Sequence, residues 1–444
     1  MVILAKTITT YTCTECATQS PVAMGRCPRC GSWGSMEAKQ SQPKLAKLSS
    51  RSALATDVTM LSEVSGASLQ RISAGNDEVN RVLGGGWVPG SVILLAGEPG
   101  IGKSTLLLQL ADYASKASRD VFYVAGEESL SQIKMRSERL TLAANVNITR
   151  ETYAPILRDY ISLNKPELVI IDSIQTLTSD ESGIAGSLSQ LRDSTAILAT
   201  VAKDVDTTLV LIGHVTKQGS IAGPKLIEHM VDATIALESA AGYRVMRAIK
   251  NRFGPAGEMG VFEMTATGMK TVANPSEAFL AEKPKDVAGS VVVAALEGQR
   301  PILLEVQALA AKSPYSSPRR VAQGLDQRRV DVILAVLERR LELPLAALDV
   351  YVNIAGGLRL TDTGVDLAVA LAVYSAVTNK IVPENTAVVG EVGLAGELRT
   401  VTQLERRLEE AKRAGYTNLI SPNAAKKGNL KTLADAIEAV WNAG

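Results

Sequence analysis

The chain has 444 residues, of which 46% are hydrophobic and 21% charged, and its formal net charge is +1. This length exceeds one ordinary hydrophobic core, so two or three domains are expected, and the composition excludes a largely disordered or membrane-embedded chain. A net charge near zero neither predicts nor excludes nucleic-acid binding, and any DNA-binding surface must be local. No apolar run is long enough to span a bilayer, and residues 1–10 lack the apolar stretch of a secretory signal. We therefore expect a cytoplasmic protein without membrane contact.

The N-terminus carries a cysteine pattern typical of a metal site. All four cysteines of the chain lie there, in two CxxC pairs: Cys13, Cys16, Cys27 and Cys30. This spacing suits a tetrahedral Zn²⁺ site of four thiolates, while a redox pair or unrelated thiols are the alternatives. A closed four-cysteine site leaves no position for water, so residues 1–35 are predicted to form a structural or binding module.

The middle of the chain indicates an α/β domain. Residues 36–69 are rich in Ser, Ala, Lys and Gln and are predicted to be a linker. From 70 to 274 strands and helices alternate, which favours a mostly parallel sheet covered on both faces. Strands are expected at 91–96, 120–125, 168–172, 208–213 and 233–238, and helices at 72–83, 104–117, 130–140 and 187–204. A domain boundary is predicted near 275–285, followed by a second α/β domain over 286–444.

A phosphate-binding loop is the most specific motif. Residues 97–104 read GEPGIGKS and stand between an apolar strand and a helix, the setting that the P-loop motif requires. Its glycines let backbone N–H groups turn toward phosphate oxygens at a helix N-terminus. Lys103 is expected to reach the β- and γ-phosphates of ATP, and Ser104 to bind Mg²⁺. The predicted nucleotide-binding residues are Gly97, Glu98, Pro99, Gly100, Ile101, Gly102, Lys103, Ser104 and Thr105.

A carboxylate at the end of a second strand completes the expected metal site. Residues 168–172 read LVIID, a buried strand that ends in Asp172. Many strands end in Asp, but at this distance downstream of a P-loop the pattern indicates a ligand of Mg²⁺, direct or through water. The predicted cofactors are therefore ATP, Mg²⁺ and Zn²⁺.

Two further polar residues follow strands that end at the same edge. Glu127 follows the strand at 120–125, and we favour it as the group that polarises the attacking water. For its neighbour Glu128, a charge that stabilises the next helix N-terminus is the alternative. His214 follows the strand at 208–213 and is expected to sense the γ-phosphate, although a lone histidine is commonly structural.

Lys250 and Arg252 form a pair of cations in the turn KNRFG, residues 250–254. Cations this far along the chain from the P-loop are candidates for donation to the γ-phosphate bound by a neighbouring subunit. Judged by residue type alone, a solvated surface turn is the simpler interpretation.

Together these motifs resemble the bacterial RadA (also called Sms) recombination-repair family over essentially the whole chain. The residues that carry the resemblance are GEPGIGKST (97–105), GEES (126–129), IIDSIQT (170–176), GHVTKQGSIAGPKLIEHMVD (213–232) and KNRFG (250–254), with the four-cysteine module. The resemblance implies a RecA-like ATPase domain, hexameric rings on DNA and ATP-driven branch migration of recombination intermediates. It favours donation of Lys250 and Arg252 to a neighbour.

The same resemblance implies loops that touch DNA, at 182–192 and 216–225. Arg192, Lys217 and Lys225 are the predicted contacts, and the lack of aromatic residues favours sequence-nonspecific contact with the phosphate backbone. The expected partners are single-stranded and branched DNA, a recombinase such as RecA, and further copies of the chain in a homo-hexamer.

The C-terminal residues, above all 390–399, resemble the proteolytic domain of Lon. Proteases of this type use a serine nucleophile activated by a lysine. Alignment places Val365 at the nucleophile and Glu405 at the lysine, so we expect this domain to be catalytically inactive. A basic stretch is a candidate auxiliary DNA surface, with solvated helix charges as the alternative; it contains Lys312, Arg319, Arg320, Arg328, Arg329, Arg339 and Arg340.

Three functions are compatible with these motifs. The favoured one is a DNA-dependent ATPase that acts as a ring-shaped helicase or branch-migration motor in repair. An ATP-dependent protease is disfavoured by Val365 and Glu405. A nucleotide-gated DNA scaffold, in which hydrolysis only times release, is disfavoured by the combination of Lys103, Glu127 and Asp172.

Overall fold

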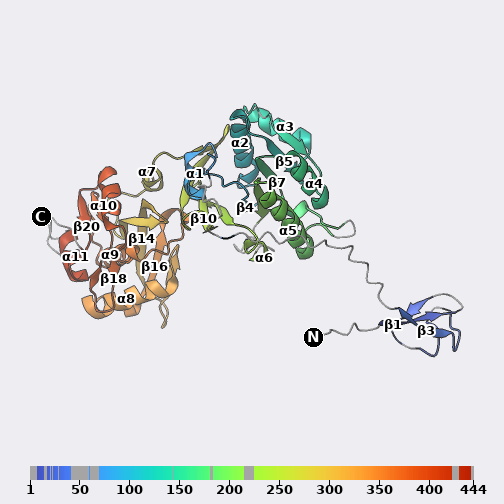
Figure 1. Cartoon of the computed structure of the whole chain (residues 1–444). Coiled ribbons are helices and arrows are strands. Elements are labelled where there is room, and N and C mark those ends of the chain that lie inside the picture. The colour runs from blue at the N-terminus through green and yellow to red at the C-terminus, as the bar shows by residue number, and fades with distance from the viewer. Residues whose placement is uncertain are drawn as a thin grey trace. The chain divides into compact units, whose positions relative to one another are not determined.

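The computed structural model describes two compact units, Met1–Ser68 and Leu69–Gly444 (Figure 1). The described residues are 8–14, 18–20, 22, 24–28, 30–41, 60, 70–143, 145–180, 184–214, 225–422 and 430–441. Within these ranges, no helix combines the length and the apolar character that crossing a bilayer requires.

The N-terminal unit is a small antiparallel sheet in the order β2-β1-β3. Its strands are β1 (Ile8–Cys13), β2 (Gln19–Ser20) and β3 (Met36–Ser41). Cys13 ends β1 opposite Met36, and a turn holds Cys27, whose carbonyl accepts a hydrogen bond from Gly31 N at 3.0 Å. Residues 36–41 are therefore a strand and not part of the predicted linker, because β1 offers them an edge to pair with.

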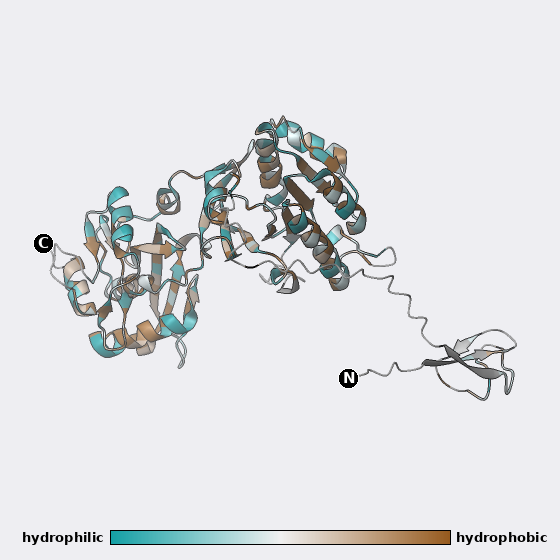
Figure 2. Cartoon of the chain, in the orientation of Figure 1, coloured by the Kyte–Doolittle hydropathy of each residue, from teal (hydrophilic) through white to brown (hydrophobic). Residues whose placement is uncertain are grey.

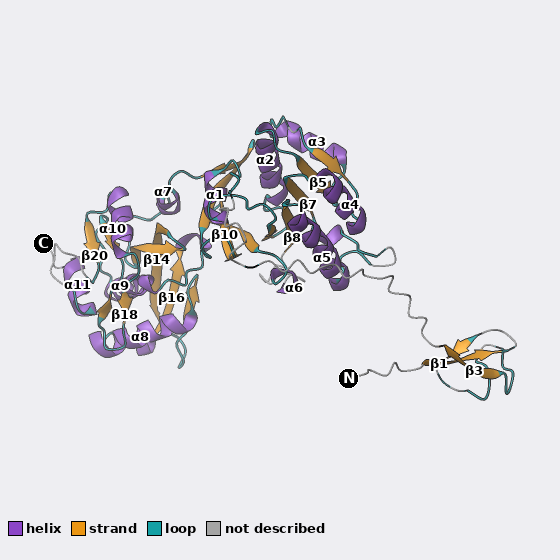
Figure 3. Ribbon diagram, in the orientation of Figure 1, coloured by secondary structure: helices purple, strands orange, loops and turns teal. Residues whose placement is uncertain are grey.

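The second unit contains a nine-stranded sheet in the order β12-β11-β10-β9-β4-β8-β7-β5-β6. Figure 3 shows strands of this sheet in orange among purple helices. Its strands are β4 (Val92–Gly97), β5 (Val121–Ala125), β6 (Asn147–Thr149), β7 (Leu168–Asp172), β8 (Thr208–His214), β9 (Ala233–Ala240), β10 (Tyr243–Asn251), β11 (Met259–Thr265) and β12 (Gly268–Thr271). The six strands from β9 to β6 pair in parallel, while β10 to β12 form an antiparallel meander beside β9. The order places β8 between the P-loop strand β4 and the strand β7 that ends in Asp172.

Helices cover both faces of the parallel strands. One face packs against α1 (Asp77–Leu83), α2 (Lys103–Lys116) and α3 (Leu130–Arg139), and the other against α4 (Ala154–Asn164), α5 (Leu188–Asp204) and α6 (Lys225–Glu228). Successive strand residues alternate between the two cores, as Tyr123 and Phe122 do. Figure 2 shows the result as brown strands between helices that carry teal on their outer sides.

The observed elements agree with the predicted alternation, with three differences. The predicted helix at 72–83 begins only at Asp77, because Ile72 pairs instead with Trp87 through two backbone hydrogen bonds. The elements β6, α4 and α6 were not predicted. Nor was the meander β10–β12, whose strands mix buried and exposed positions without a clean period.

The C-terminal part of the same unit contains a second sheet, in the order β15-β16-β14-β13-β17-β20, and a small hairpin β18-β19. Its strands are β13 (Ser290–Glu297), β14 (Arg300–Lys312), β15 (Arg320–Gln323), β16 (Leu348–Ile354), β17 (Thr386–Val388), β18 (Glu391–Val392), β19 (Leu398–Arg399) and β20 (Asn418–Ile420). Its helices are α7 (Pro275–Leu280), α8 (Gln327–Leu341), α9 (Asp366–Thr378), α10 (Leu404–Arg413) and α11 (Leu433–Trp441). Helices α8, α9 and α11 line one core of this sheet, and α7 and α10 pack against its other face.

The two sheets share buried side chains. Val245 and Val261 from the nine-stranded sheet belong to one apolar cluster with Val291 and Ile302 from the C-terminal sheet. Helix α7, inside the predicted boundary at 275–285, is bonded to the second sheet, since Ser276 Oγ accepts from Leu303 N at 3.1 Å. The residues from 70 onward therefore form one unit.

Candidate active site

The P-loop turns from the buried strand β4 into the first turn of α2. Gly100 and Gly102 have φ values of 78° and 115°, which favour glycine. A Cβ at Gly102 would lie 2.5 Å from Met264 Cε, so a side chain there would also collide with β11. Helix α2 begins at Lys103 immediately afterwards, so the loop residues lie at a helix N-terminus, which attracts phosphate.

Lys103 lies inside the curve of this loop. Its side chain is buried, and Nζ donates to the carbonyl oxygens of Gly97 at 2.8 Å and Glu98 at 2.9 Å. Burial lowers the pKa of Lys103, and the carboxylates of Asp172 and Glu127 oppose this shift only in part. The ammonium group is thus held where the β- and γ-phosphates of a nucleotide are expected.

Asp172 is buried at the end of β7 and bonded to two hydroxyl groups. It accepts from Tyr123 Oη at 2.7 Å and from the hydroxyl of Ser104. Burial raises the pKa of Asp172, the two hydroxyl bonds lower it, and Glu127 raises it again, with a net increase. Carboxylate and hydroxyl oxygens are ligands that Mg²⁺ prefers, so Ser104 and Asp172, which already touch, fit a magnesium site.

His214 connects the lysine of the loop to Glu127. Its Nδ1 lies 3.3 Å from Lys103 Nζ and its Nε2 lies 2.9 Å from Glu127 Oε1. Because a lysine ammonium group can only donate, Nδ1 accepts and Nε2–H donates to the carboxylate. Burial would raise the pKa of Glu127, but hydrogen bonds from Ser173 and His214 outweigh it, and the pKa is lowered. Glu127 is therefore an ionised carboxylate at neutral pH.

Tyr123 and Ser173 were not predicted from the sequence. Tyr123 lies in the apolar strand VFYVA, and its ring packs in the hydrophobic core. Only the pairing of β5 with β7 brings its hydroxyl group to Asp172. Ser173 follows Asp172, and a polar residue after a strand carries no specific signal. Glu128 forms an ion pair with Arg136 of α3, its Oε1 2.5 Å from Nη2.

Lys250 and Arg252 lie elsewhere in the fold, at the end of β10, where both contact the segment that precedes β9. Lys250 Nζ donates to the carbonyl oxygens of Glu228 at 2.6 Å and Val231 at 2.8 Å. Arg252 Nη1 lies 3.1 Å from Asp232 Oδ1. Both cations are therefore bonded to their own chain, and both lie beside the start of β9.

This position is at the end of the parallel strands opposite to the P-loop; both places are called edges of the sheet here. Asp232 Oδ2 accepts from the backbone N–H of Val92, the first residue of β4, whereas the P-loop follows Gly97 at the other end of that strand. The five residue steps between them span about 17 Å at roughly 3.3 Å per residue. Arg252, with 56% of its side chain exposed, does not face the P-loop of its own chain.

The predicted DNA contacts are only partly described. Arg192 lies on α5 with 55% of its side chain exposed and pairs with Asp193 at 2.9 Å. Lys225 is the first residue of α6. Lys217 and the other residues of 215–224 lie outside the described residues, as do 181–183.

The N-terminal cysteines form a cluster that fits a metal ion. The sulfur atoms of Cys13, Cys27 and Cys30 all lie within 4.8 Å of one another, with 3.6 Å between those of Cys13 and Cys30. Sulfur atoms of a tetrahedral zinc site at ~2.3 Å from the ion lie about 3.8 Å apart. Cys16, the fourth predicted ligand, lies outside the described residues.

The position predicted for a protease nucleophile is filled by packed side chains. Val365 is buried, and Arg407, with no exposed surface, forms a two-pronged ion pair with Asp362. A Cβ at Gly364 would lie 2.7 Å from Arg407 Nη1. Arg407, and not the exposed Glu405 at the aligned lysine position, is thus the residue of α10 that reaches this segment.

The basic stretch of the C-terminal domain is mostly solvated. Exposed members are Lys312, Arg319, Arg328, Arg339 and Arg340. Arg329 is different, because its guanidinium is bonded to the fully buried Asp366, with Nε 2.9 Å from Oδ1. Arg329 therefore stabilises the fold through this ion pair and is not a solvated charge.

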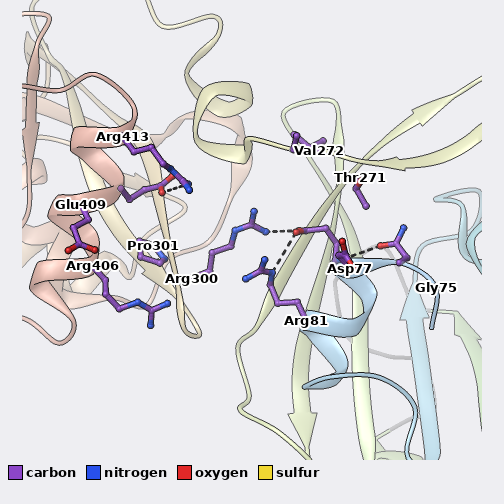
Figure 4. Close-up of a pocket in the computed structure, with 14 residues that line it drawn as sticks. Gly75, Asp77, Arg81, Thr271, Val272, Arg300, Pro301, Arg406, Glu409 and Arg413 are labelled. Carbon is purple, nitrogen blue, oxygen red and sulfur yellow. Dashed lines mark hydrogen bonds and ion pairs between the residues drawn. The ribbon is translucent and has the colours of Figure 1, made fainter. Parts of the chain in front are cut away.

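A cavity of about 840 Å³ lies between α1, β14 and α10. Figure 4 shows the side chains of Arg300 and Arg81 close together at this cavity. Both pair with the buried carboxylate of Glu78, whose oxygens lie 2.5 Å and 3.6 Å from them. Arg413 is paired with Glu410 in the same way. Because its lining contains as many carboxylates as arginines, this cavity does not resemble a phosphate site. The ion pair of Arg300 with Glu78 joins β14 to α1.

Comparisons with known proteins agree with this arrangement. Residues 61–220 match the family described as AAA domain, 11–38 the rubredoxin metal binding domain, and 320–425 the subunit ChlI of Mg-chelatase. These matches, together with the observed topology, confirm the predicted α/β fold, with a P-loop ATPase domain between an N-terminal zinc module and a C-terminal α/β domain.

Full-length relatives are similar over nearly the whole chain. Three proteins described as DNA repair protein RadA are 44% identical (Halalkalibacterium halodurans, 95% of this chain and 93% of the relative), 45% identical (Streptococcus pyogenes serotype M6, 96% and 95%) and 41% identical (Bacillus subtilis strain 168, 96% and 94%). Among solved structures, a KaiC-like protein from Pyrococcus horikoshii superposes with a TM-score of 0.39 at 17% identity, over 46% of this chain and 99% of that chain.

Proposed function

The chain belongs to the RadA family of bacterial DNA repair proteins, and we propose that it is a DNA-dependent ATPase whose copies form a hexameric ring and drive branch migration of recombination intermediates. One observation carries the ring hypothesis: Lys250 and Arg252 lie at the edge of the sheet opposite the P-loop of their own chain. Cations so placed meet a nucleotide only when a second copy presents its P-loop to them.

Within one chain, the proposed roles follow from the contacts at the P-loop edge. Lys103 binds the β- and γ-phosphates, and Ser104 and Asp172 hold Mg²⁺, which when bound neutralises phosphate charge. Glu127 orients the attacking water through its carboxylate, because it is ionised and His214 and Ser173 fix it. His214 contacts both Lys103 and Glu127. When the γ-phosphate displaces the Lys103 side chain, the histidine loses that contact, and its hydrogen bond to the carboxylate of Glu127 changes.

Between chains, Arg252 and Lys250 stabilise the transferring phosphoryl group of the neighbour. Removing such a cation typically lowers turnover by about 10³- to 10⁵-fold. Arg192, Lys217 and Lys225 contact the phosphate backbone of single-stranded or branched DNA, without sequence preference. A recombinase such as RecA is the expected protein partner, since it produces the branched substrates.

A protease function has little support. The space beside Val365 is filled by the Asp362–Arg407 ion pair, and valine cannot attack a carbonyl. We propose that the C-terminal domain has no peptidase activity and serves as a scaffold for assembly, with its exposed arginines as an auxiliary DNA surface.

Hydrolysis and unwinding assays on single-stranded, forked and three-stranded DNA test the proposal. We expect DNA to stimulate ATP hydrolysis and expect a forked or three-stranded substrate to be unwound, with Lys103→Ala inactive in both assays. DNA binding gated by ATP without unwinding would favour the scaffold hypothesis. ATP hydrolysis that none of these DNA substrates stimulates would contradict the hypothesis of a DNA-dependent motor.

A further inference from the structure

We infer that Asp232 and Lys203 are positioning residues that hold Arg252 ready for the nucleotide of a neighbouring subunit. The inference rests on the proposed role of Arg252 between chains. It concerns two residues, one from the segment before β9 and one from α5, that touch neither the P-loop nor DNA in the proposed function.

Asp232 is a rigid anchor for the arginine. The residue is 4% exposed, and its Oδ2 accepts from Val92 N at 3.0 Å. Its own N–H donates to Val92 O at 2.8 Å. One bond ties the carboxylate and the other ties the backbone of Asp232 to β4, the central strand of the sheet. A site held by a strand is positioned more accurately than one on a loop.

Arg252 is fastened at two points yet keeps most of its donors. Its backbone N–H donates to Asp232 O at 3.1 Å, and Nη1 lies 3.1 Å from Asp232 Oδ1. That ion pair is the one hydrogen bond of the guanidinium within the described part of the chain. A guanidinium has five N–H donors, so four remain for a phosphate, and 56% of the side chain is exposed to reach it.

Lys203 restores the positive charge that this anchoring would cancel. Its Nζ lies 3.5 Å from the same oxygen, Asp232 Oδ1, and its side chain is 49% exposed. An isolated Asp–Arg pair is neutral and attracts an anion weakly, whereas two cations around one carboxylate keep a net charge of +1. The arrangement therefore fixes the direction of Arg252 without removing its attraction to the γ-phosphate.

Lys250, in β10, is bonded to the same segment. The carbonyl oxygens of Glu228 and Val231 that it bonds precede Asp232 by four residues and one residue. Carbonyl groups orient an ammonium group without neutralising it. Both proposed trans-acting cations are thus positioned by residues 228–232.

A double-mutant cycle on the assembled, DNA-bound protein tests the inference. The variants are Lys203→Met, Arg252→Ala and the two combined, with Lys203→Arg as the charge-conserving control. We expect Lys203→Met to lower kcat about tenfold with an unchanged KM for ATP, and Lys203→Arg to retain activity. The combined variant should be no slower than Arg252→Ala alone, because Lys203 acts through Arg252.

Asp232→Asn provides a second test, since an amide oxygen still accepts from Val92 N while the charge is lost. We expect lower kcat, unchanged KM and, as a check of folding, an unchanged thermal unfolding profile. Multiplicative losses in the Lys203/Arg252 cycle, or full activity of Lys203→Met beside an impaired Arg252→Ala, would overturn the inference alone. Full activity of Arg252→Ala would instead overturn the proposed function of this residue and the inference with it.

Discussion

His214 Nε2 lies 2.9 Å from Glu127 Oε1, and the opposite nitrogen of the same ring faces Lys103. This contact arises because β8 lies between β4 and β7 in the sheet. The end of β8 therefore stands between the phosphate-binding lysine and the proposed base. In the proposed function, His214 therefore transmits the position of Lys103 to Glu127.

Replacing either partner of this contact should slow hydrolysis without preventing nucleotide binding. We expect Glu127→Gln to lower kcat by about 10²- to 10⁴-fold, the usual loss for a general base. His214→Ala should lower it by about 10- to 100-fold, as for residues that orient another group. Steady-state hydrolysis with a fluorescent nucleotide titration measures both effects; a His214→Ala enzyme with normal kcat would assign the histidine a structural role.

Tyr123→Phe should change the pH dependence and the magnesium requirement together. The tyrosine hydroxyl lowers the pKa of Asp172 and opposes the effect of burial. Its removal should raise the pKa of Asp172 further, so that the acid limb of kcat/KM moves to higher pH and more Mg²⁺ is needed for half-maximal rate. Phe122→Leu, on the same strand but facing the other core, serves as the control. Superimposable profiles for Tyr123→Phe and wild type would refute this role.

Asp172→Asn should abolish hydrolysis and yet stabilise the nucleotide-free protein. The pKa of Asp172 is raised in the folded state, mainly by burial. Its protonated form therefore favours folding below the unfolded pKa, and this contribution is lost as pH rises through the folded pKa. The variant should unfold at a higher temperature than wild type at neutral pH without Mg²⁺, with the difference shrinking in acid. A lower unfolding temperature of Asp172→Asn than of wild type at neutral pH would contradict this. It would show that the groups around Asp172 stabilise its charged form more than burial destabilises it.

The buried pair Arg407–Asp362 should be a large contributor to the stability of the C-terminal domain. Arg407→Met removes the cation that faces Asp362, whose side chain is only 11% exposed. Removing one partner of such a pair typically costs about 3–5 kcal/mol in the free energy of unfolding. Arg406→Met, the exposed neighbour on the same helix, should change it by less than about 0.5 kcal/mol. Urea unfolding of both variants checks the difference, and equal effects would contradict it. Val365→Ser should not create peptidase activity, because the arginine still fills the position beside it.

Loss of the metal should affect only the N-terminal unit. Cys27→Ser removes one thiolate of the cluster and should abolish stoichiometric zinc binding. Because residues 1–68 form a compact unit of their own, the thermal unfolding and nucleotide affinity of the ATPase domain should not change. Metal analysis and a fluorescent nucleotide titration test this, with Met24→Ala in the same module as the control. Reduced nucleotide affinity would mean that the module supports the ATPase domain.

Much of this protein could be predicted from local patterns. The P-loop and the cysteine pairs are contiguous motifs, and their chemistry depends on spacing within a few residues. The alternation of strands and helices similarly predicted the α/β fold, because the spacing of apolar residues within each segment differs between strands and helices. The residues missed at the site, Tyr123 and Ser173, act through contacts between strands that are distant in sequence.

By itself, the sequence predicted which residues bind phosphate, magnesium and zinc, since these predictions follow from residue type and short spacing. Only the tertiary structure decided where the groups meet. Strand order placed His214 between Lys103 and Glu127, and it placed Arg252 at the far edge of the sheet on Asp232. The physical reason is that the order of strands depends on the burial of apolar side chains over the whole sheet. This order therefore cannot be read from any single segment of the chain.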